Sequence, residues 1–345
     1  MDSQVSIIIV SWNKKEFVLD CLKSLETQTF KDFETILVDN GSTDGLSEAV
    51  EKEYSKVKIV RLKENLGFVG GNNEGYKHSK GKYIVLLNND TIVDKDWLKE
   101  LVKMMNSDSK IGACQSKILD MKDHSSFEFT GAAGGLMDIY GYGFCRGRVF
   151  DEVEKDNGQY GDIINIFWTA GVSMITRRDI IEKIGLFDEY YFIYCEEVDF
   201  CWRLNLAGYE LKYVPTSIVY HYGGASSQRG KVKINFKMAY LLHRNHMITL
   251  LKNYSIKSWF RIIPIKIILE FMAIGGFLFS NPARSIGILK SFWWVLTHPR
   301  LILKKHNEVQ KLRKVSDKEI MKKMSKKSTA IGYWIFGKKK WSDYF

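Results

Sequence analysis

Three apolar runs near the start of the chain each end in side chains that can bind a ligand. The endings read SWN at 11–13, DNGSTDG at 39–45 and NNDT at 88–91. They place single carboxylates beside amides and hydroxyls. Carboxylate oxygens bind hard cations such as Mg²⁺, and they accept hydrogen bonds from hydroxyl and N–H groups. These residues therefore favour the binding of a polar ligand, with Asp39 and Asp90 as the most informative positions.

A further acidic group, YCEEVDFCWR at 194–203, has the composition of an acid–base site. Glu196 and Glu197 stand at the expected start of a helix, where the helix dipole favours their ionised form. An ionised carboxylate can take a proton from a reacting hydroxyl. The plainer alternative is an ordinary acidic first turn, in which Asp199 pairs with Arg203 four residues further on.

The segments that carry these groups alternate between strand-like and helix-like patterns. Strands that are apolar on both faces, separated by helices, predict an α/β fold with a mostly parallel central sheet flanked by helices. Ligands of such sheets bind beyond the carboxyl ends of the strands. The expected strands are 5–10, 34–39, 57–62, 82–87, 172–176, 211–214 and 217–221, and the expected helices are 15–25, 46–53, 72–79, one from 177 and one from about 196.

Several common classes of protein are disfavoured. The first strand is followed by SWNKKEF rather than by GxGxxG, and no P-loop motif occurs. Five cysteines without CxxC spacing indicate neither a disulfide framework nor a zinc ribbon. The first residues, MDSQVSIIIV, lack a basic segment before the apolar run, so a signal peptide is not expected.

Beyond residue 230 the segments are helical and apolar, and they are rich in Lys, Arg and Trp. The apolar run at 271–279 has nine residues, whereas about 20 are needed to cross a bilayer. Of the net charge of +11, the fourteen basic and four acidic residues of 300–345 supply +10. We expect residues 231–345 to form amphipathic, basic helices that lie on an anionic membrane surface. A helical subdomain or a dimer interface is the alternative.

Three blocks of the sequence, taken in order, resemble family 2 inverting glycosyltransferases of the GT-A fold. They run from VSIIIV to NGSTDG (5–45), from ENLGF to LLNNDT (64–91) and from WTAGVS to VYHYGG (168–224). The most similar subgroup is the rhamnosyltransferase-like enzymes that extend lipid-linked glycans. The resemblance covers roughly residues 4–227. It implies a GT-A catalytic domain at 1–230, which moves a sugar from a nucleotide-diphosphate donor to an acceptor hydroxyl.

The resemblance also implies a donor site along the strand ends. Asp39 would accept hydrogen bonds from the nucleotide base and ribose. Asp90 ends the family's Asp-x-Asp type motif, which reads NND here, and would bind a Mg²⁺ or Mn²⁺ ion that bridges the donor phosphates. His221 would complete the metal site from the opposite side. The expected donor-binding residues are Ser11, Asn13, Asp39, Gly67, Asn73, Asn88, Asn89 and Asp90.

Each of these assignments has a structural alternative. Asp39 and Asp44 could both cap turns, and we favour capping for Asp44 alone. The glycines around Gly67 would also suit a tight turn, and a lone histidine is most often a hydrogen-bonded residue without a metal. Arg229 and Lys231 follow the segment that contains His221. Their side chains would either close over the diphosphate of the donor or stay solvated.

For the acid–base step, the resemblance assigns Glu197 as the base that deprotonates the acceptor. Family members usually have Asp at this position, so the side chain here is one methylene longer. Glu196 and Asp199 would assist the base or position the acceptor. Trp168 would border the acceptor sugar, although core packing explains it nearly as well. The expected acceptor-binding residues are Trp168, Gly171, Glu196 and Arg203.

These inferences predict a peripheral enzyme at the cytoplasmic face of the cell membrane, with a lipid-linked glycan as its acceptor. A homo-oligomer is compatible with the sequence, and the donor sugar and base stay open. A catalytically silent nucleotide-sugar-binding scaffold of a glycan assembly complex is the alternative, because the NND and EE motifs depart from the family pattern. Nucleic-acid binding is disfavoured, since the basic tail lacks the interleaved aromatic residues of RNA-binding sheets.

Overall fold

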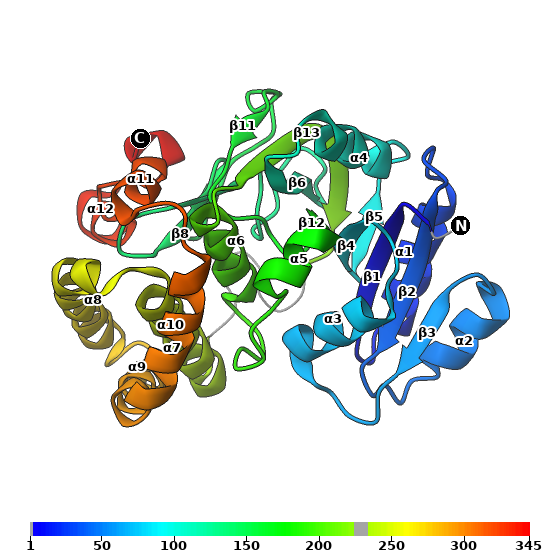
Figure 1. Ribbon diagram of the computed structural model, residues 1–345. Coiled ribbons are helices and arrows are strands. Elements are labelled where there is room, and N and C mark those ends of the chain that lie inside the picture. The colour runs from blue at the N-terminus through cyan, green and yellow to red at the C-terminus, as the bar shows by residue number, and fades with distance from the viewer. Residues whose placement is uncertain (1–2, 224–233) are drawn as a thin grey trace.

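The computed structural model describes residues 3–223 and 234–345, and a mixed nine-stranded sheet forms its centre (Figure 1). Its strands are β1 (Val5–Ser11), β2 (Phe33–Asp39), β3 (Lys58–Arg61), β4 (Tyr83–Asn88), β5 (Thr91–Val93), β6 (Ile111–Asp120), β11 (Ile164–Asn165), β12 (Ser173–Arg177) and β13 (Glu210–His221). They lie in the order β11-β13-β6-β12-β4-β1-β2-β3, and β5 pairs with β13 outside this path.

Four of the eight pairings between the described strands of this sheet are parallel, and they include the three longest. β1 pairs in parallel with β2 and β4, β2 with β3, and β6 with β13. β12 runs antiparallel between β4 and β6. Strands covered on both faces need continuous apolar runs, and the first five residues of β4 are accordingly all buried. The predicted α/β class with a mostly parallel sheet is confirmed.

The two strands expected at 211–214 and 217–221 are one strand, β13. Its register against β6 slips between Val214 and Ile218. Pro215 stands in this interval and has no N–H to donate to a ladder, so an irregular register is the arrangement that a long strand can adopt there. The slip lets one strand continue to His221.

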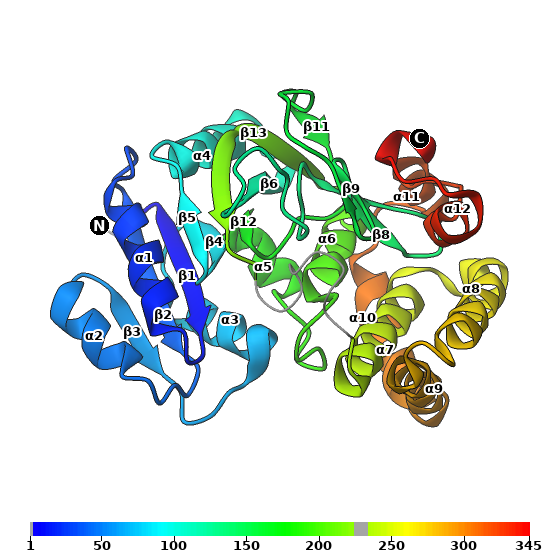
Figure 2. The same ribbon diagram turned by 180° about the vertical axis from the view of Figure 1, so that it is seen from behind.

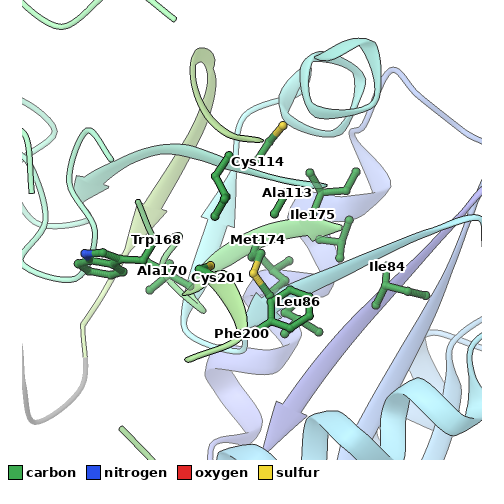
Figure 3. Packing of buried hydrophobic residues seen from close by; sticks show 14 of the residues in the cluster. Ile84, Leu86, Ala113, Cys114, Trp168, Ala170, Met174, Ile175, Phe200 and Cys201 are labelled. Atoms are coloured by element: carbon green, nitrogen blue, oxygen red, sulfur yellow. The ribbon is translucent and has the colours of Figure 1, made fainter. Parts of the chain in front are cut away.

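Six helices accompany the sheet: α1 (Lys15–Glu26), α2 (Leu46–Glu53), α3 (Gly67–His78), α4 (Trp97–Ser107), α5 (Arg178–Ile184) and α6 (Glu196–Leu206). α1 and α3 cover opposite faces, since each stands in front of β1 in only one of the two views (Figures 1 and 2). α3 begins five residues earlier than expected, at Gly67. Figure 3 shows Phe200 of α6 beside Met174 of β12 and Leu86 of β4, which fixes α6 against the sheet.

The glycine-rich segment from residue 127 onward contains a small antiparallel sheet. Its strands are β7 (Gly135–Met137), β8 (Gly143–Cys145), β9 (Arg148–Val149) and β10 (Glu152–Val153). The segment lies between the main sheet and the C-terminal helices (Figure 1).

The C-terminal region gathers on the side of the sheet away from β3 (Figures 1 and 2). Tyr254 and Ile262 belong to the same hydrophobic core as the strands, as do Ile320 and Met324, so this core continues past residue 230. Among the described residues no helix has the length and apolar character needed to cross a membrane. The helices are α7 (Phe236–Asn253), α8 (Ile256–Phe277), α9 (Pro282–Thr297), α10 (Pro299–Leu312), α11 (Asp317–Ile320) and α12 (Thr329–Phe336), with 3₁₀ turns at Met321–Lys323 and Trp341–Asp343.

The last twenty residues return to the small sheet. The backbone of Ser325 donates to Met137 O at 2.9 Å and accepts from Ile139 N at 3.0 Å. Thr329 donates from both its N–H and its hydroxyl to the buried carboxylate of Asp138. Residues near the C-terminus are therefore packed and hydrogen-bonded against the small sheet.

Candidate active site

The carboxyl ends of β1, β2 and β4 bring three predicted residues to one edge of the sheet. In the strand register Ser11 stands opposite Asp39, and Val10 stands opposite Asn88. The Asn89 amide donates to Ser11 Oγ at 2.8 Å, which ties the loop after β4 to the end of β1. The structure therefore places Ser11, Asp39 and the NND group together, as expected for parallel strands.

Asp39 fixes the turn that follows it. One carboxylate oxygen accepts from Ser42 N at 2.8 Å and the other from Ser47 Oγ at 2.5 Å. Each carboxylate oxygen can accept two hydrogen bonds, so fixing the turn is compatible with binding a donor. Asp44 accepts from Lys15 N at 2.9 Å, so it caps the start of α1 rather than α2, the next helix along the chain.

Asn13 joins the two loops at this edge. Its side-chain oxygen accepts from Thr43 N at 2.7 Å, and its own N–H donates to Ser42 Oγ at 3.0 Å. Its φ of 52° lies in the left-handed region, which asparagine tolerates better than most residues. These contacts explain why an asparagine stands at the end of β1.

Two residues predicted to bind the donor have structural partners instead. Gly67, at φ 75°, starts α3 where an added Cβ would lie 2.5 Å from Phe192 O. Asn73 uses its amide nitrogen to donate to Phe187 O at 3.0 Å, and its oxygen accepts from Phe187 N at 3.2 Å. We therefore withdraw Asn73 from the donor-binding set, because both ends of its amide hold the segment that precedes α6.

Asp90 and His221 meet at this edge. β13 ends at His221, which stands opposite Thr91 of β5. His221 Nε2 lies 3.0 Å from Asp90 Oδ1 and 3.3 Å from Asn88 Nδ2. On the other side of the ring, Nδ1 lies 3.2 Å from Glu128 Oε2, and both the ring and Glu128 are buried.

The two carboxylates control the charge of this histidine. Burial lowers the pKa of His221, but hydrogen bonds and charge from Asp90 and Glu128 outweigh it and raise the pKa to about 10. For Asp90 the effects have the opposite signs. Burial alone would raise the pKa of its carboxyl, but the hydrogen bond and charge of His221 hold that pKa below the usual value. Without a metal, the three side chains therefore form a carboxylate–imidazolium–carboxylate row.

The row fits a divalent cation at one end. Asp90 Oδ1 and His221 Nε2, at 3.0 Å, are close enough to be neighbouring ligands of one ion. Glu128 contacts the opposite ring nitrogen, so it would orient the histidine rather than bind the same ion. No group of three or more His, Cys, Asp or Glu side chains among residues 3–223 and 234–345 could hold a metal by itself. The donor phosphates and water would have to supply the remaining ligands.

Glu196 and Glu197 begin α6 as predicted, but their charge state differs from the expectation. Burial raises the pKa of Glu197 to about 7 and the pKa of Glu196 well above its usual value. The Oε2 atoms of both side chains are buried, and neither has a hydrogen-bond partner among the described residues. Desolvation therefore outweighs the helix dipole, which was expected to keep them ionised. A carboxyl with a pKa near 7 is suited to exchange protons at neutral pH.

Asp199 and Arg203 form the ion pair that the sequence left open. Asp199 is fully buried and accepts from Arg203 Nε at 3.0 Å, from Lys252 Nζ at 3.0 Å and from Asn253 Nδ2 at 2.9 Å. Arg203 also donates to the backbone carbonyls of residues 184–186. We therefore withdraw Asp199 from the catalytic set and Arg203 from the acceptor-binding set, because their polar atoms are engaged inside the protein.

Trp168 is a core residue in this structure. It is buried, and its indole N–H donates to Leu136 O at 2.8 Å (Figure 3). At Gly171 an added Cβ would lie 2.9 Å from the Phe68 ring, which accounts for a glycine there by packing. Arg229 and Lys231 lie outside the described residues.

Glu128 was missed by sequence reasoning. It stands between aromatic residues in FEFTG, a stretch without a motif or helical spacing that would single out a carboxylate. Its burial beside His221 was the informative property, and that property depends on the packing of segments more than ninety residues apart.

The comparison with protein families decides the classification. The model of "Glycosyl transferase family 2" matches residues 6–185. The chain belongs to this family. Rhamnosyltransferase WbbL of Escherichia coli is 27% identical over 229 residues, covering 63% of this chain and 83% of its own. An uncharacterised glycosyltransferase of Rickettsia conorii is 30% identical over 154 residues, but these cover only 44% of this chain and 24% of that protein.

Solved structures share the fold. A mannosyltransferase of Pyrobaculum calidifontis, in complex with GDP-Man and Mn²⁺, has a TM-score of 0.51 at 16% identity, covering 91% of this chain and 82% of its own. Residues 1–349 of Staphylococcus aureus TarS, in complex with UDP-GlcNAc, have a TM-score of 0.51 at 17% identity, covering 75% and 69% of the two chains. The predicted GT-A fold is confirmed, with a helical region at the C-terminus.

Proposed function

We propose that this family 2 glycosyltransferase moves a sugar, with inversion, from a nucleotide-diphosphate donor to a hydroxyl of a lipid-linked glycan at a membrane surface. The observation that carries the proposal is the meeting of Asp90 and His221 at the strand-end edge, where Asp39 also lies. Rhamnose is the proposed sugar, since a relative that is 27% identical over 83% of its own length is a rhamnosyltransferase.

Glu197 is the proposed base. Its ionised carboxylate takes the proton of the acceptor hydroxyl while that oxygen forms a bond to the anomeric carbon. The bond from this carbon to the diphosphate breaks on the opposite face, and the electron pair leaves with the diphosphate. Burial gives Glu197 a pKa of about 7, which makes it a stronger base than an exposed glutamate and still leaves it largely ionised at slightly alkaline pH.

Asp90 and His221 are the proposed protein ligands of a Mn²⁺ or Mg²⁺ ion. When bound, the cation neutralises charge on the donor's diphosphate. The protein's own part is to hold the two ligand atoms 3.0 Å apart, with Glu128 fixing the imidazole from behind. His221 must lose its ring proton at Nε2 to bind the ion, so metal binding releases a proton.

The test is release of free nucleotide by the purified protein from a panel of nucleotide sugars, with Mn²⁺ and a short lipid-pyrophosphate acceptor. Turnover that requires both acceptor and metal supports the proposal. A protein that binds nucleotide but never cleaves any donor would instead be the silent scaffold, the alternative left open by the NND and EE motifs.

The membrane part of the proposal is supported by the exposed apolar side chains of α8, α9, α12 and the turn between α8 and α9. Phe279 is 94% exposed, Leu296 73% and Trp293 69%. Ring contacts of Phe271 with Phe292 and of Phe277 with Trp334 connect the three helices into one neighbourhood. Large apolar side chains gathered in this way are uncommon on monomeric soluble proteins and are typical of interaction surfaces.

Exposed basic residues accompany this apolar surface and favour lipid as its partner. Lys290 lies on α9, Arg300 begins α10, and Lys339 and Lys340 follow α12, all of them exposed. Tryptophan and phenylalanine enter the interfacial layer of a bilayer, while Lys and Arg attract anionic headgroups. We propose that α8, α9 and α12 lie on an anionic, cytoplasmic membrane face and bring the site to its lipid-linked acceptor.

The membrane proposal is tested by replacing Phe279, Trp293 and Leu296 together with serine. The variant should lose most of its cosedimentation with vesicles of phosphatidylglycerol and phosphatidylcholine, and it should keep its nucleotide affinity. Ile163→Ser is the matched control, because Ile163 is also exposed but lies in the sheet region. Unchanged sedimentation of the triple variant would contradict the proposal.

A further inference from the structure

The turn before α6 has an unusual backbone. Tyr194 and Cys195 follow one another with φ values of 77° and 67°, both in the left-handed region. Residues with a side chain avoid this region, and two in succession persist only where the surroundings hold them. Cys195 is the N-cap of α6 and makes no side-chain capping bond, so the turn does not stabilise itself in the usual way.

Asn245, on α7, holds this turn. It is fully buried, and its amide nitrogen lies 2.9 Å from both Ile193 O and Tyr194 O. The guanidinium of Arg244 donates to its side-chain oxygen at 2.8 and 3.0 Å, so the whole amide is oriented. Two donors of one side chain are therefore aimed at two consecutive carbonyls of the strained turn.

The same face of α7 continues along the segment between α5 and α6. Thr249, one turn after Asn245, has its Oγ1 at 2.8 Å from the Tyr191 hydroxyl. Two turns after Asn245, Lys252 binds Asp188 and Asp199, and Asn253 donates to Asp199. Positions four, seven and eight residues after Asn245 share its face of a helix. α7 thus holds this segment from both sides of the turn, through polar contacts that are mostly buried.

The placement of the two glutamates depends on this turn. The Oε2 atoms of Glu196 and Glu197 have no hydrogen-bond partner in the described part of the chain. No such bond aims these oxygens, so their position follows largely from the backbone at the start of α6. A change in the dihedral angles of Tyr194 or Cys195 would move both carboxyl groups.

We propose that Asn245 is a positioning residue for sugar transfer: it holds the left-handed Tyr194–Cys195 turn and so fixes where Glu197 lies. The inference rests on the proposed role of Glu197 as the base. It gives the C-terminal helices a part in catalysis besides the proposed attachment to lipid, because α7 belongs to that region.

The experiment compares Asn245→Ala with Thr249→Val in the full chain. Asn245→Ala removes both bonds to the turn and should lower kcat about tenfold or more, since small displacements of a reacting group are costly. The KM for the donor and the nucleotide Kd should change little. Thr249→Val removes a buried hydrogen bond on the same face of α7 but leaves the bonds to the Tyr194–Cys195 turn in place. It should not displace Glu197, so kcat should stay within about twofold of its original value.

A second variant separates positioning from general damage. Cys195→Gly, added to Asn245→Ala, puts at the N-cap a residue that adopts positive φ freely, and it should restore much of the lost kcat. Amide hydrogen exchange gives a readout that does not depend on enzymatic activity. In the single variant Asn245→Ala, exchange in the first turn of α6 should be faster than in the unaltered protein.

Three results would overturn the proposal: unchanged kcat in Asn245→Ala, an equal loss of kcat in Thr249→Val, or no recovery in the double variant. Failure of the proposed function is distinguishable, because then the unaltered protein would transfer no sugar from any donor. In that case the exchange measurement would still report whether Asn245 holds the turn.

Discussion

The surroundings of Asp90 and Glu197, the two acidic residues most important to the proposal, shift their pKa values in opposite directions. His221 lowers the pKa of Asp90, so its carboxylate stays charged at every physiological pH. Burial raises the pKa of Glu197 to about 7, so its carboxyl can gain or lose a proton near neutrality. Carboxyl groups separated in this way commonly divide the tasks of binding charge and moving protons.

The raised pKa of Glu197 predicts a pH dependence of transfer. The base must be ionised, so kcat should rise with pH through about 7 and fall at lower pH as Glu197 takes up a proton. Initial rates at saturating donor between pH 5.5 and 9 would measure this. A kcat that stayed flat down to pH 5.5 would exclude Glu197 as the base.

Glu197→Gln should abolish transfer and leave nucleotide binding nearly intact. It should also stabilise the protein at pH 8. The folded-state pKa of about 7 lies above the ordinary 4.5, so the free energy of unfolding falls as pH rises from 4.5 through 7. Glutamine escapes this penalty, and the gain at pH 8 should be about 3 kcal/mol. Urea unfolding at pH 5 and pH 8 tests it, because the gain should fall below about 1 kcal/mol at pH 5.

Asp90→Asn should sharply raise the Mn²⁺ concentration needed for half-maximal transfer, because the single charged ligand is lost. Asp120→Asn is the control: Asp120 stands opposite His221 in the β6–β13 ladder, and its side chain accepts hydrogen bonds from Lys122 N and Asp123 N of its own turn. Titration of activity with Mn²⁺ would compare the two. Equal metal dependence in both variants would remove Asp90 from the metal site.

The sequence indicated those site residues whose position follows from strand order. Asp39, Asp90 and His221 each end or follow a strand, so their meeting could be expected from the fold. Asn73 could not be judged in this way, because its amide is engaged by the backbone of a residue more than a hundred positions away. Glu128 was missed for the same reason, since only folding brings it to His221.

At the level of elements, local patterns predicted many of the buried strands and the start of α6, but they missed the buried strand β6 and the helix α4. The one long strand β13 was predicted as two strands on either side of Pro215, whereas the ladder passes this proline with a slip in register. The start of α3 was placed too late, since the glycines from Gly67 onward lower helix propensity. Contact with Phe192 determines that start.

Gly67 offers a test at this scale. Gly67→Ala meets both a positive φ and a backbone oxygen at 2.5 Å, and it should destabilise the protein by about 3 kcal/mol or more. Gly158→Ala is the matched control, with φ 79° but no atom within 4 Å of the added Cβ, and it should cost about 1 kcal/mol. Denaturant unfolding measures both, and equal losses would contradict the close approach.

For the whole molecule, composition suggested an appended helical region, whereas in the structure the main hydrophobic core continues into that region. The basic side chains of these apolar helices were expected to face an anionic membrane surface. Lys266 and Glu270 of α8 are instead buried as an ion pair, and His243 of α7 lies 2.6 Å from Glu270. Sequence patterns record how many charges a helix has but not which of them find a partner inside the protein.

Removal of residues 325–345 should lower the stability of the entire protein. In this segment Thr329 supplies two of the hydrogen bonds that the buried Asp138 carboxylate accepts, and Trp341 donates to the Tyr160 hydroxyl at 2.8 Å. A buried carboxylate that loses hydrogen bonds is costly, so we expect the free energy of unfolding to fall by about 3 kcal/mol or more. Thermal melts followed by circular dichroism would measure it. An unchanged melting temperature would show that the segment is dispensable for folding.

The polar face of α7 has a practical consequence for work on this protein. A fragment trimmed to residues 1–230, the part that carries Asp90 and Glu197, would lack α7. The Asn245 amide of this helix binds carbonyls of the turn before α6, and its Lys252 ammonium neutralises Asp188 and Asp199. Such a preparation would leave Asp199 with one cation fewer and the Tyr194 carbonyl bare. An inactive fragment would therefore be a false negative. Inhibitors selected on it would meet a differently arranged site in the full chain.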